Sequence, residues 1–203
     1  EEDHWLAAAE WADRLGADII QSSLTFYADD YDQKTMDGRS PVSQAATIAA
    51  EKGILVVNAM GNEGDTDLHY MGAPADAPKV FSVGGCLPML PVHIPFSSTG
   101  PNAMGHLKPD LAAPGFVLTA LKKGKFGEKA GTSFSAPLIA GLAAALWEGQ
   151  PELTRDSLHQ QLQRLGHFFP YYDYELGHGV PDLRRFQAPP DTTTAPYDIL
   201  LRG

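Results

Sequence analysis

The run ILVVNAM at residues 54–60 is the feature that most restricts the fold of this chain. It is almost entirely apolar and rich in β-branched residues, without the polar alternation of a strand that faces water on one side. Such a run is typical of a strand buried on both faces, which requires a sheet covered by helices on each side. The preceding segment, 40–53, predicts one such helix, with Ser40 as N-cap, Pro41 in the first turn and Gly53 at its end.

Other segments continue this alternation of strand and helix. Apolar runs at 18–24, 79–85 and 115–121 predict strands, and the residue pattern over 132–148 and 154–165 predicts helices. A further helix is predicted at the start of the chain from the helical spacing of Trp5, Ala8, Ala9, Ala12 and Leu15. Because strand–helix–strand units pair in parallel through right-handed crossovers, the predicted fold class is α/β with a mainly parallel sheet.

Length and composition set the remaining limits. The 203 residues suit one domain, which we expect over 1–187, followed by a Pro/Thr-rich tail or linker over 188–203. A net charge of -10 argues against a nucleic-acid partner, and a single cysteine, Cys86, rules out an intrachain disulfide framework. No apolar run reaches membrane-spanning length. The chain opens inside a predicted helix without an initiator Met or a signal sequence, so we expect a piece of a longer protein.

Two polar residues stand at positions where an α/β protein can perform chemistry. Ser133 follows a Gly-Thr turn at the start of the predicted helix 132–148, and Asn62 follows the buried strand between two glycines. Taken singly, Ser133 could be a helix cap and Asn62 a turn residue. A Gly-x-Ser-x-Gly nucleophile elbow is disfavoured, because Ser135 stands where glycine is needed and the residues before Ser133 are loop-like.

Several segments taken together resemble the subtilisin-like serine proteases (subtilases). The resemblance covers about residues 5 to 186, and it is carried in order by the segments GADIIQSSLT, GILVVNAMGNEG, APADAPKVFSVGG, FSSTGP, KPDLAAPG, GTSFSAPLIAG and YELGHGVPDL. It implies a three-layer subtilisin-like fold, incomplete in this chain, and serine endopeptidase activity toward polypeptides in extended conformation. It also implies that Ser133 is the nucleophile and that Asn62 forms the oxyanion hole with the Ser133 backbone N–H.

The resemblance also suggests where a substrate would bind. Residues expected to pair with the substrate strand or to line the pocket for the residue before the scissile bond are Ser23, Leu24, Thr25, Ala59, Met60, Gly61 and Gly72. Subtilases usually carry glycine where Thr25 stands, so a narrower pocket is expected. The Ala73–Pro74 bond is a candidate for the cis peptide that these proteases often carry near this site.

The sequence departs from the family in lacking a recognisable catalytic Asp and His, which in subtilases precede the serine. His178 lies after the serine in a segment that resembles the family's closing turn, and His69 is interpreted as a loop residue. The other histidines, His4, His93, His106, His159 and His167, match no family position for the base. The chain could be the C-terminal part of a catalytic domain whose Asp and His lie upstream, one chain of a two-chain enzyme, or a non-catalytic binding module. The first is favoured, because both Ser133 and Asn62 are kept.

No cofactor is required by this chemistry, and no metal site is predicted. Subtilases often bind calcium, but the acidic segments 29–32 and 64–67 lack the spacing of an EF-hand and are interpreted as solvated loops. Family resemblance also implies a secreted or cell-envelope protein, with no membrane partner.

Overall fold

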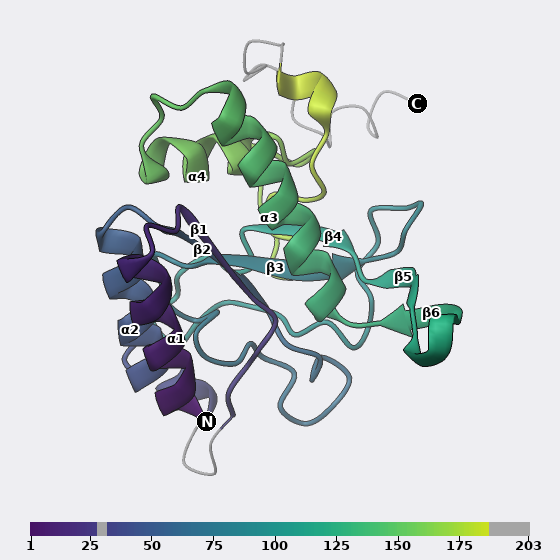
Figure 1. Cartoon of the computed structure of the whole chain (residues 1–203). Helices are drawn as coiled ribbons and strands as arrows, with labels where there is room; N and C mark the ends of the chain where they lie inside the picture. Colours follow the sequence, from purple (N-terminus) through teal and green to yellow (C-terminus); the bar gives the residue numbers. More distant parts are fainter. Residues whose placement is uncertain (28–31, 187–203) are drawn as a thin grey trace.

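A four-stranded parallel sheet forms the centre of the computed structural model, which describes residues 1–27 and 32–186 (Figure 1). Its strands lie in the order β1 (Ile19–Ser22), β2 (Leu55–Ala59), β3 (Phe81–Cys86) and β4 (Leu111–Pro114). The predicted tail at 188–203 lies outside the described residues.

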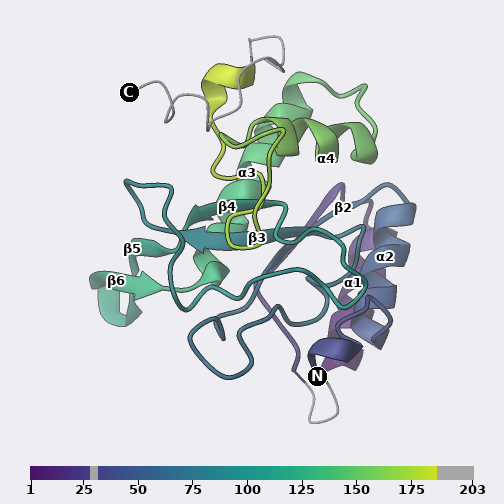
Figure 2. The same ribbon diagram turned by 180° about the vertical axis from the view of Figure 1, so that it is seen from behind.

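Helices cover both faces of this sheet. Side chains of β2 point alternately to opposite sides, so Val56 packs with α1 (Glu2–Arg14) and α2 (Pro41–Glu51), whereas Leu55 and Val57 pack with α3 (Thr132–Gly149) and α4 (Arg155–Arg164). Figures 1 and 2 show α1 and α2 side by side on one face and α3 crossing the other. The predicted α/β class and its three layers are therefore confirmed.

The predicted cap of α2 is present. The Ser40 side chain accepts a hydrogen bond from the backbone N–H of Ser43 at 3.2 Å, and Pro41 occupies the first helical position. Gly53, just beyond the helix, has a positive φ of 100°, a backbone conformation that favours glycine. The chain then enters β2 directly, which fixes where that strand starts.

Of the two predictions for the segments just before α3, the strand within 115–121 is confirmed and the loop before Ser133 is wrong. Segment 115–121 does contain a strand, β5 (Phe116–Ala120), but it pairs antiparallel with β6 (Phe126–Ala130) in a separate hairpin, and β4 is the fourth strand of the sheet. The residues before Ser133, interpreted as a loop, form β6. β6 is largely exposed, and its sequence FGEKA lacks the apolar run that marks a buried strand.

Short 3₁₀ helices occupy some of the connections. They are η1 (Gln33–Thr35), η2 (Lys122–Gly124) and η3 (Leu183–Phe186). η2 closes the β5–β6 hairpin, and positive φ angles of 63° at Lys123 and 69° at Gly124 make the tight turn there. Within the described ranges, no helix is both long and apolar enough to cross a bilayer.

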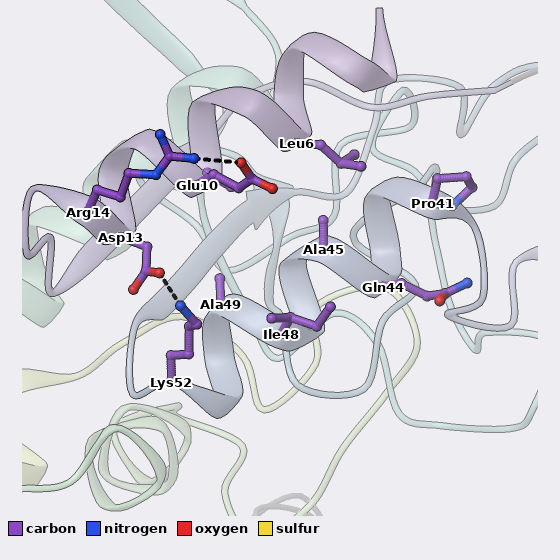
Figure 3. Close-up of a pocket in the computed structure, with 11 residues that line it drawn as sticks. Leu6, Glu10, Asp13, Arg14, Pro41, Gln44, Ala45, Ile48, Ala49 and Lys52 are labelled. Atoms are coloured by element: carbon purple, nitrogen blue, oxygen red, sulfur yellow. Dashed lines mark hydrogen bonds and ion pairs between the residues drawn. The ribbon is translucent and has the colours of Figure 1, made fainter.

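A groove of about 690 Å³ runs between α1 and α2 (Figure 3). Arg14 pairs with Glu10 at 3.1 Å, and Lys52 pairs with Asp13 across the two helices. Apolar side chains such as Leu6 line the rest of it. None of its lining residues belongs to the site predicted from the sequence.

Candidate active site

The predicted site residues gather where β1 and β2 end and α3 begins. β2 runs directly into Gly61 and Asn62, and Gly131 precedes α3 as its N-cap. Gly131 has φ 149°, and a Cβ added there would lie 3.6 Å from the Asn62 amide. That distance is an ordinary contact, so it is the positive φ of this turn, and not lack of space, that favours glycine here.

Asn62 is bonded to the first residue of α3. Asn62 Oδ1 accepts hydrogen bonds from the Thr132 backbone N–H at 2.8 Å and from the Thr132 hydroxyl at 3.1 Å. Asn62 is exposed, and its Nδ2 donates to no group within the described residues. This arrangement fixes the oxygen of the amide and leaves its N–H groups directed to solvent, where a substrate oxygen could accept from them.

Ser133 is half-buried in the first turn of α3, where backbone N–H groups have no partner within the helix. Its hydroxyl lies 3.5 Å from the carbonyl oxygen of Ser23, and the Ser23 hydroxyl donates to the Ser133 carbonyl at 2.9 Å. These contacts tie residues 23–25, which continue the chain beyond β1 and are called the extension of β1, to the helix. The positive end of the helix dipole and the free N–H groups make this a favourable place for negative charge.

The extension of β1 presents alternate backbone groups inward and outward. Leu24 bonds inward: its N–H lies 3.3 Å from Ser22 Oγ, and its carbonyl accepts from Asn58 Nδ2 at 3.1 Å. Backbone groups of Thr25 bond to nothing within residues 1–27 and 32–186. Such an edge can accept a further strand. Asn58, fully buried on β2, holds the edge in place and was not singled out from the sequence.

The residues predicted to line the pocket differ in which of their atoms can border it. Ala59 and Met60 are 1% and 0% exposed, with side chains in opposite core clusters, so only their main chain can border a site. The Met60 carbonyl accepts from the Gly72 N–H at 3.2 Å, which places Gly72 beside the end of β2. The Ala73–Pro74 peptide is cis, as predicted.

Tyr27, which the sequence analysis did not single out, lies against both Gly61 and Gly72. A Cβ added to Gly61 would stand 2.1 Å from Tyr27 Oη, and one added to Gly72 would stand 2.8 Å from Tyr27 Cζ and 3.0 Å from Thr25 Cβ. Thr25 therefore also borders this space.

No hydrogen bond joins a histidine to Ser133 within the described residues. His178 Nδ1 lies 2.8 Å from the Tyr171 carbonyl, and its ring contacts Phe169 and Tyr172. His69 Nδ1 lies 3.2 Å from the carbonyl of Asp67. Both histidines are thus engaged in local contacts in their loops.

The thiol of Cys86 offers no alternative nucleophile. It is buried in β3, and burial raises its pKa to about 11, which leaves it protonated at neutral pH. The described residues contain no group of three or more His, Cys, Asp or Glu side chains placed to hold a metal ion. Residues 29–31 of the first acidic segment lie outside the described residues.

The fold is similar to those of solved protease structures. Sphericase superposes with a TM-score of 0.71 at 25% identity, a match that covers 90% of this chain and 64% of Sphericase. A self-cleaved protease domain of PatA gives a TM-score of 0.68 at 23% identity and covers 91% of this chain. The fold is thus that of subtilisin-like proteins. The family model of the subtilases matches residues 2–179, and the chain belongs to the subtilase family.

Curated relatives agree with this assignment. Serine protease AprX of Bacillus subtilis (strain 168) is 31% identical over 167 residues, and subtilisin E of the same organism is 31% identical over 168 residues. These alignments cover 72% and 80% of this chain. They cover only 37% of AprX and 40% of subtilisin E, so the chain spans about two fifths of these relatives.

Proposed function

We propose that the protein to which this chain belongs is a serine endopeptidase in which Ser133 attacks the peptide carbonyl. Asn62 Nδ2 and the Ser133 backbone N–H form the oxyanion hole of the tetrahedral intermediate. The observation that carries this proposal is the pairing of Asn62 Oδ1 with the first residue of α3, because it fixes the amide while its N–H groups stay free. Donors that are oriented before the reaction stabilise the developing negative charge without reorganisation.

The proton of Ser133 must pass to a base, and within the described residues no hydrogen bond joins the Ser133 hydroxyl to such a group. A serine hydroxyl without an adjacent base is a weak nucleophile, and no described histidine bonds to Ser133. We propose that the catalytic Asp and His are supplied by residues upstream of this chain in the same protein, which makes 1–187 the C-terminal part of the catalytic domain. The coverage of only 37% of AprX supports a longer protein. A partner chain that supplies both groups is the alternative.

The substrate would lie as an extended strand beside Ser23, Leu24 and Thr25. Pairing of this kind draws affinity from main-chain hydrogen bonds, and the free backbone groups of Thr25 can supply them. The side chain before the scissile bond would then point between Gly61 and Gly72. We also propose that the protein is secreted or held in the cell envelope, on the strength of its resemblance to bacterial subtilases.

Labelling with a fluorophosphonate probe, which reacts with activated serines, tests the proposal. The chain is labelled alone and in the longer protein that includes its upstream segment, and the modified residue is found by intact mass and peptide mapping. We expect modification of Ser133 only in the longer protein. Ser133→Ala removes the label, whereas Ser135→Ala retains it; Ser135 is a matched control, since it lies on the same helix and its hydroxyl bonds to the Pro114 carbonyl.

The other outcomes have definite meanings. Labelling of Ser133 in the chain alone would show that a histidine within it serves as the base, against the upstream assignment. An unlabelled Ser133 in both forms would contradict the protease and favour a non-catalytic binding module of the same fold.

A further inference from the structure

The aromatic ring of Tyr27 fills the space between the two glycines that border the predicted pocket. Its Oη is the atom closest to an added Cβ at Gly61, at 2.1 Å, and its Cε2 and Cζ lie 3.0 and 2.8 Å from an added Cβ at Gly72. Because neither glycine has a side chain, the space between them is large enough to hold the side chain of another residue. In this structure, that space holds the phenol ring of Tyr27 and not a substrate side chain.

The backbone before Tyr27 is anchored to the same wall. Phe26 and Ala73 exchange two backbone hydrogen bonds, with N···O distances of 2.8 Å from Phe26 N and 3.2 Å from Ala73 N. This short bridge sets the next side chain, Tyr27, over Gly72. Thr25 packs on the same side, so the ring is enclosed by residues of both walls.

The phenol is held by two long hydrogen bonds. Tyr27 Oη lies 3.3 Å from the Tyr70 carbonyl and 3.3 Å from Ser98 Oγ. Both distances are longer than the usual O···O distance of a hydroxyl hydrogen bond, which is about 2.7–2.8 Å. Ser98 in turn accepts from the backbone N–H of Glu63, beside Asn62. Burial raises the pKa of Tyr27 to about 12, so the phenol stays neutral at physiological pH.

We propose that Tyr27 determines specificity by filling the pocket for the residue that precedes the scissile bond, so that the enzyme cleaves after small residues such as alanine or glycine. The inference rests on the proposed function, since it takes Gly61 and Gly72 as pocket walls. A large aromatic residue fits only if the phenol leaves both glycines and gives up its contacts with Tyr70 and Ser98.

The test compares two peptide substrates in the longer protein, one with alanine and one with phenylalanine before the scissile bond. Wild-type protein prefers alanine, and Tyr27→Ala raises the ratio of kcat/KM for phenylalanine over alanine by at least about tenfold, a modest change for a pocket that gains the volume of a ring. Tyr27→Phe keeps the ring and loses the hydroxyl, so it retains the wild-type preference. Since both substrates are measured in one preparation, the ratio does not depend on the folded fraction.

Specific results overturn the inference. If Tyr27→Ala raises the ratio of kcat/KM for phenylalanine over alanine by less than tenfold, the ring does not limit the pocket. A wild-type protein that prefers the phenylalanine substrate leads to the same conclusion. If Tyr27→Ala yields no folded protein, Tyr27→Val gives the same ratio measurement with a smaller change in packing. Fluorophosphonate labelling separates the two failures: labelled Ser133 with an unchanged ratio removes only the role of Tyr27, whereas unlabelled wild type removes the proposed protease and this inference with it.

Discussion

Thr132 holds the amide of Asn62 through two hydrogen bonds, and its hydroxyl also contacts Gly61. The hydroxyl lies 3.1 Å from Asn62 Oδ1, 3.1 Å from the Gly61 carbonyl and 3.3 Å from the Gly61 N–H. A hydroxyl has one hydrogen to donate and can accept as well, so a single side chain connects the turn after β2 with the start of α3. Thr132 is fully buried, which makes these contacts costly to lose.

Thr132→Val keeps the shape of the side chain and removes its hydroxyl. We expect a loss of about 1–3 kcal/mol in the free energy of unfolding, because buried groups of Gly61 lose a partner. We also expect kcat to fall about tenfold with KM little changed, as Asn62 becomes less well oriented. Urea denaturation and steady-state kinetics of the longer protein measure both. Thr119→Val on the β5–β6 hairpin is the matched control, and an unchanged kcat in Thr132→Val would show that this hydroxyl does not position Asn62.

Single residues of the site could be predicted to different extents. Ser133 and Asn62 stand in recognisable motifs, so their positions beside the helix start and the strand end followed from the sequence. Asn58 and Tyr27 could not be found in this way. Asn58 acts on Leu24, 34 residues away, and Tyr27 acts on Gly61 and Gly72, so their contacts depend on the packing of separate segments.

At the level of secondary-structure elements, Asp110 joins β3, β4 and α4 through one buried carboxylate. Its Oδ2 accepts from the Ser82 N–H at 2.8 Å and from Lys108 Nζ at 3.2 Å, and its Oδ1 lies 2.9 Å from His159 Nε2 and 2.8 Å from Gln163 Nε2. Burial alone would raise the pKa of Asp110. The Lys108 ammonium and His159 outweigh that effect and hold the pKa well below its usual range.

This carboxylate should make the protein sensitive to acid. Because the pKa of Asp110 is lower in the folded state than the usual value of about 3.9, the unfolded state binds more protons as pH falls below about 4, and stability is lost there. Asp110→Asn removes the carboxylate that contacts the buried Lys108 ammonium at 3.2 Å, so we expect a loss of about 3–5 kcal/mol at pH 7 and a weaker dependence on pH below 4. Urea denaturation across pH 3–7 measures this. Asp182→Asn, at an exposed pair with Arg184, is the control, and an equal loss there would contradict the role of Asp110.

Helices and strands could be predicted where a buried element leaves an apolar pattern or a cap in the sequence. β2 and α2 carry an apolar run and a helix cap, and both were predicted close to their observed limits. β4 has only four residues and ends at Pro114, so nothing in LAAP distinguishes it from a loop. β5 and β6 are stabilised by pairing with each other. The sequence does not show which strand pairs with which, so this hairpin could not be predicted from it.

At the scale of the whole molecule, the β1 edge of the sheet and one face of α3 have no cover within the described residues. β1 pairs only with β2 there, which leaves it as a sheet edge. α3 is apolar nearly all round, yet Leu138 is 48% exposed, and Ala144 and Ala145 are exposed on the same face. A helix of this composition belongs in a protein interior. We expect the upstream segment of the longer protein to cover this face and to extend the sheet beyond β1.

The isolated chain should therefore be poorly stable and should aggregate through the β1 edge and the apolar face of α3. Light scattering is expected to rise with the concentration of the isolated chain, and its thermal transition to be broad, whereas the longer protein melts cooperatively as a monomer. Leu138→Gln separates the two forms: it lowers aggregation of the isolated chain, but it destabilises the longer protein by about 1–3 kcal/mol, because the amide would be buried without partners. Leu118→Gln, at a 72% exposed position on the hairpin, leaves the longer protein unchanged. A sharp, cooperative melt of the isolated monomer would show instead that α3 and β1 need no further cover.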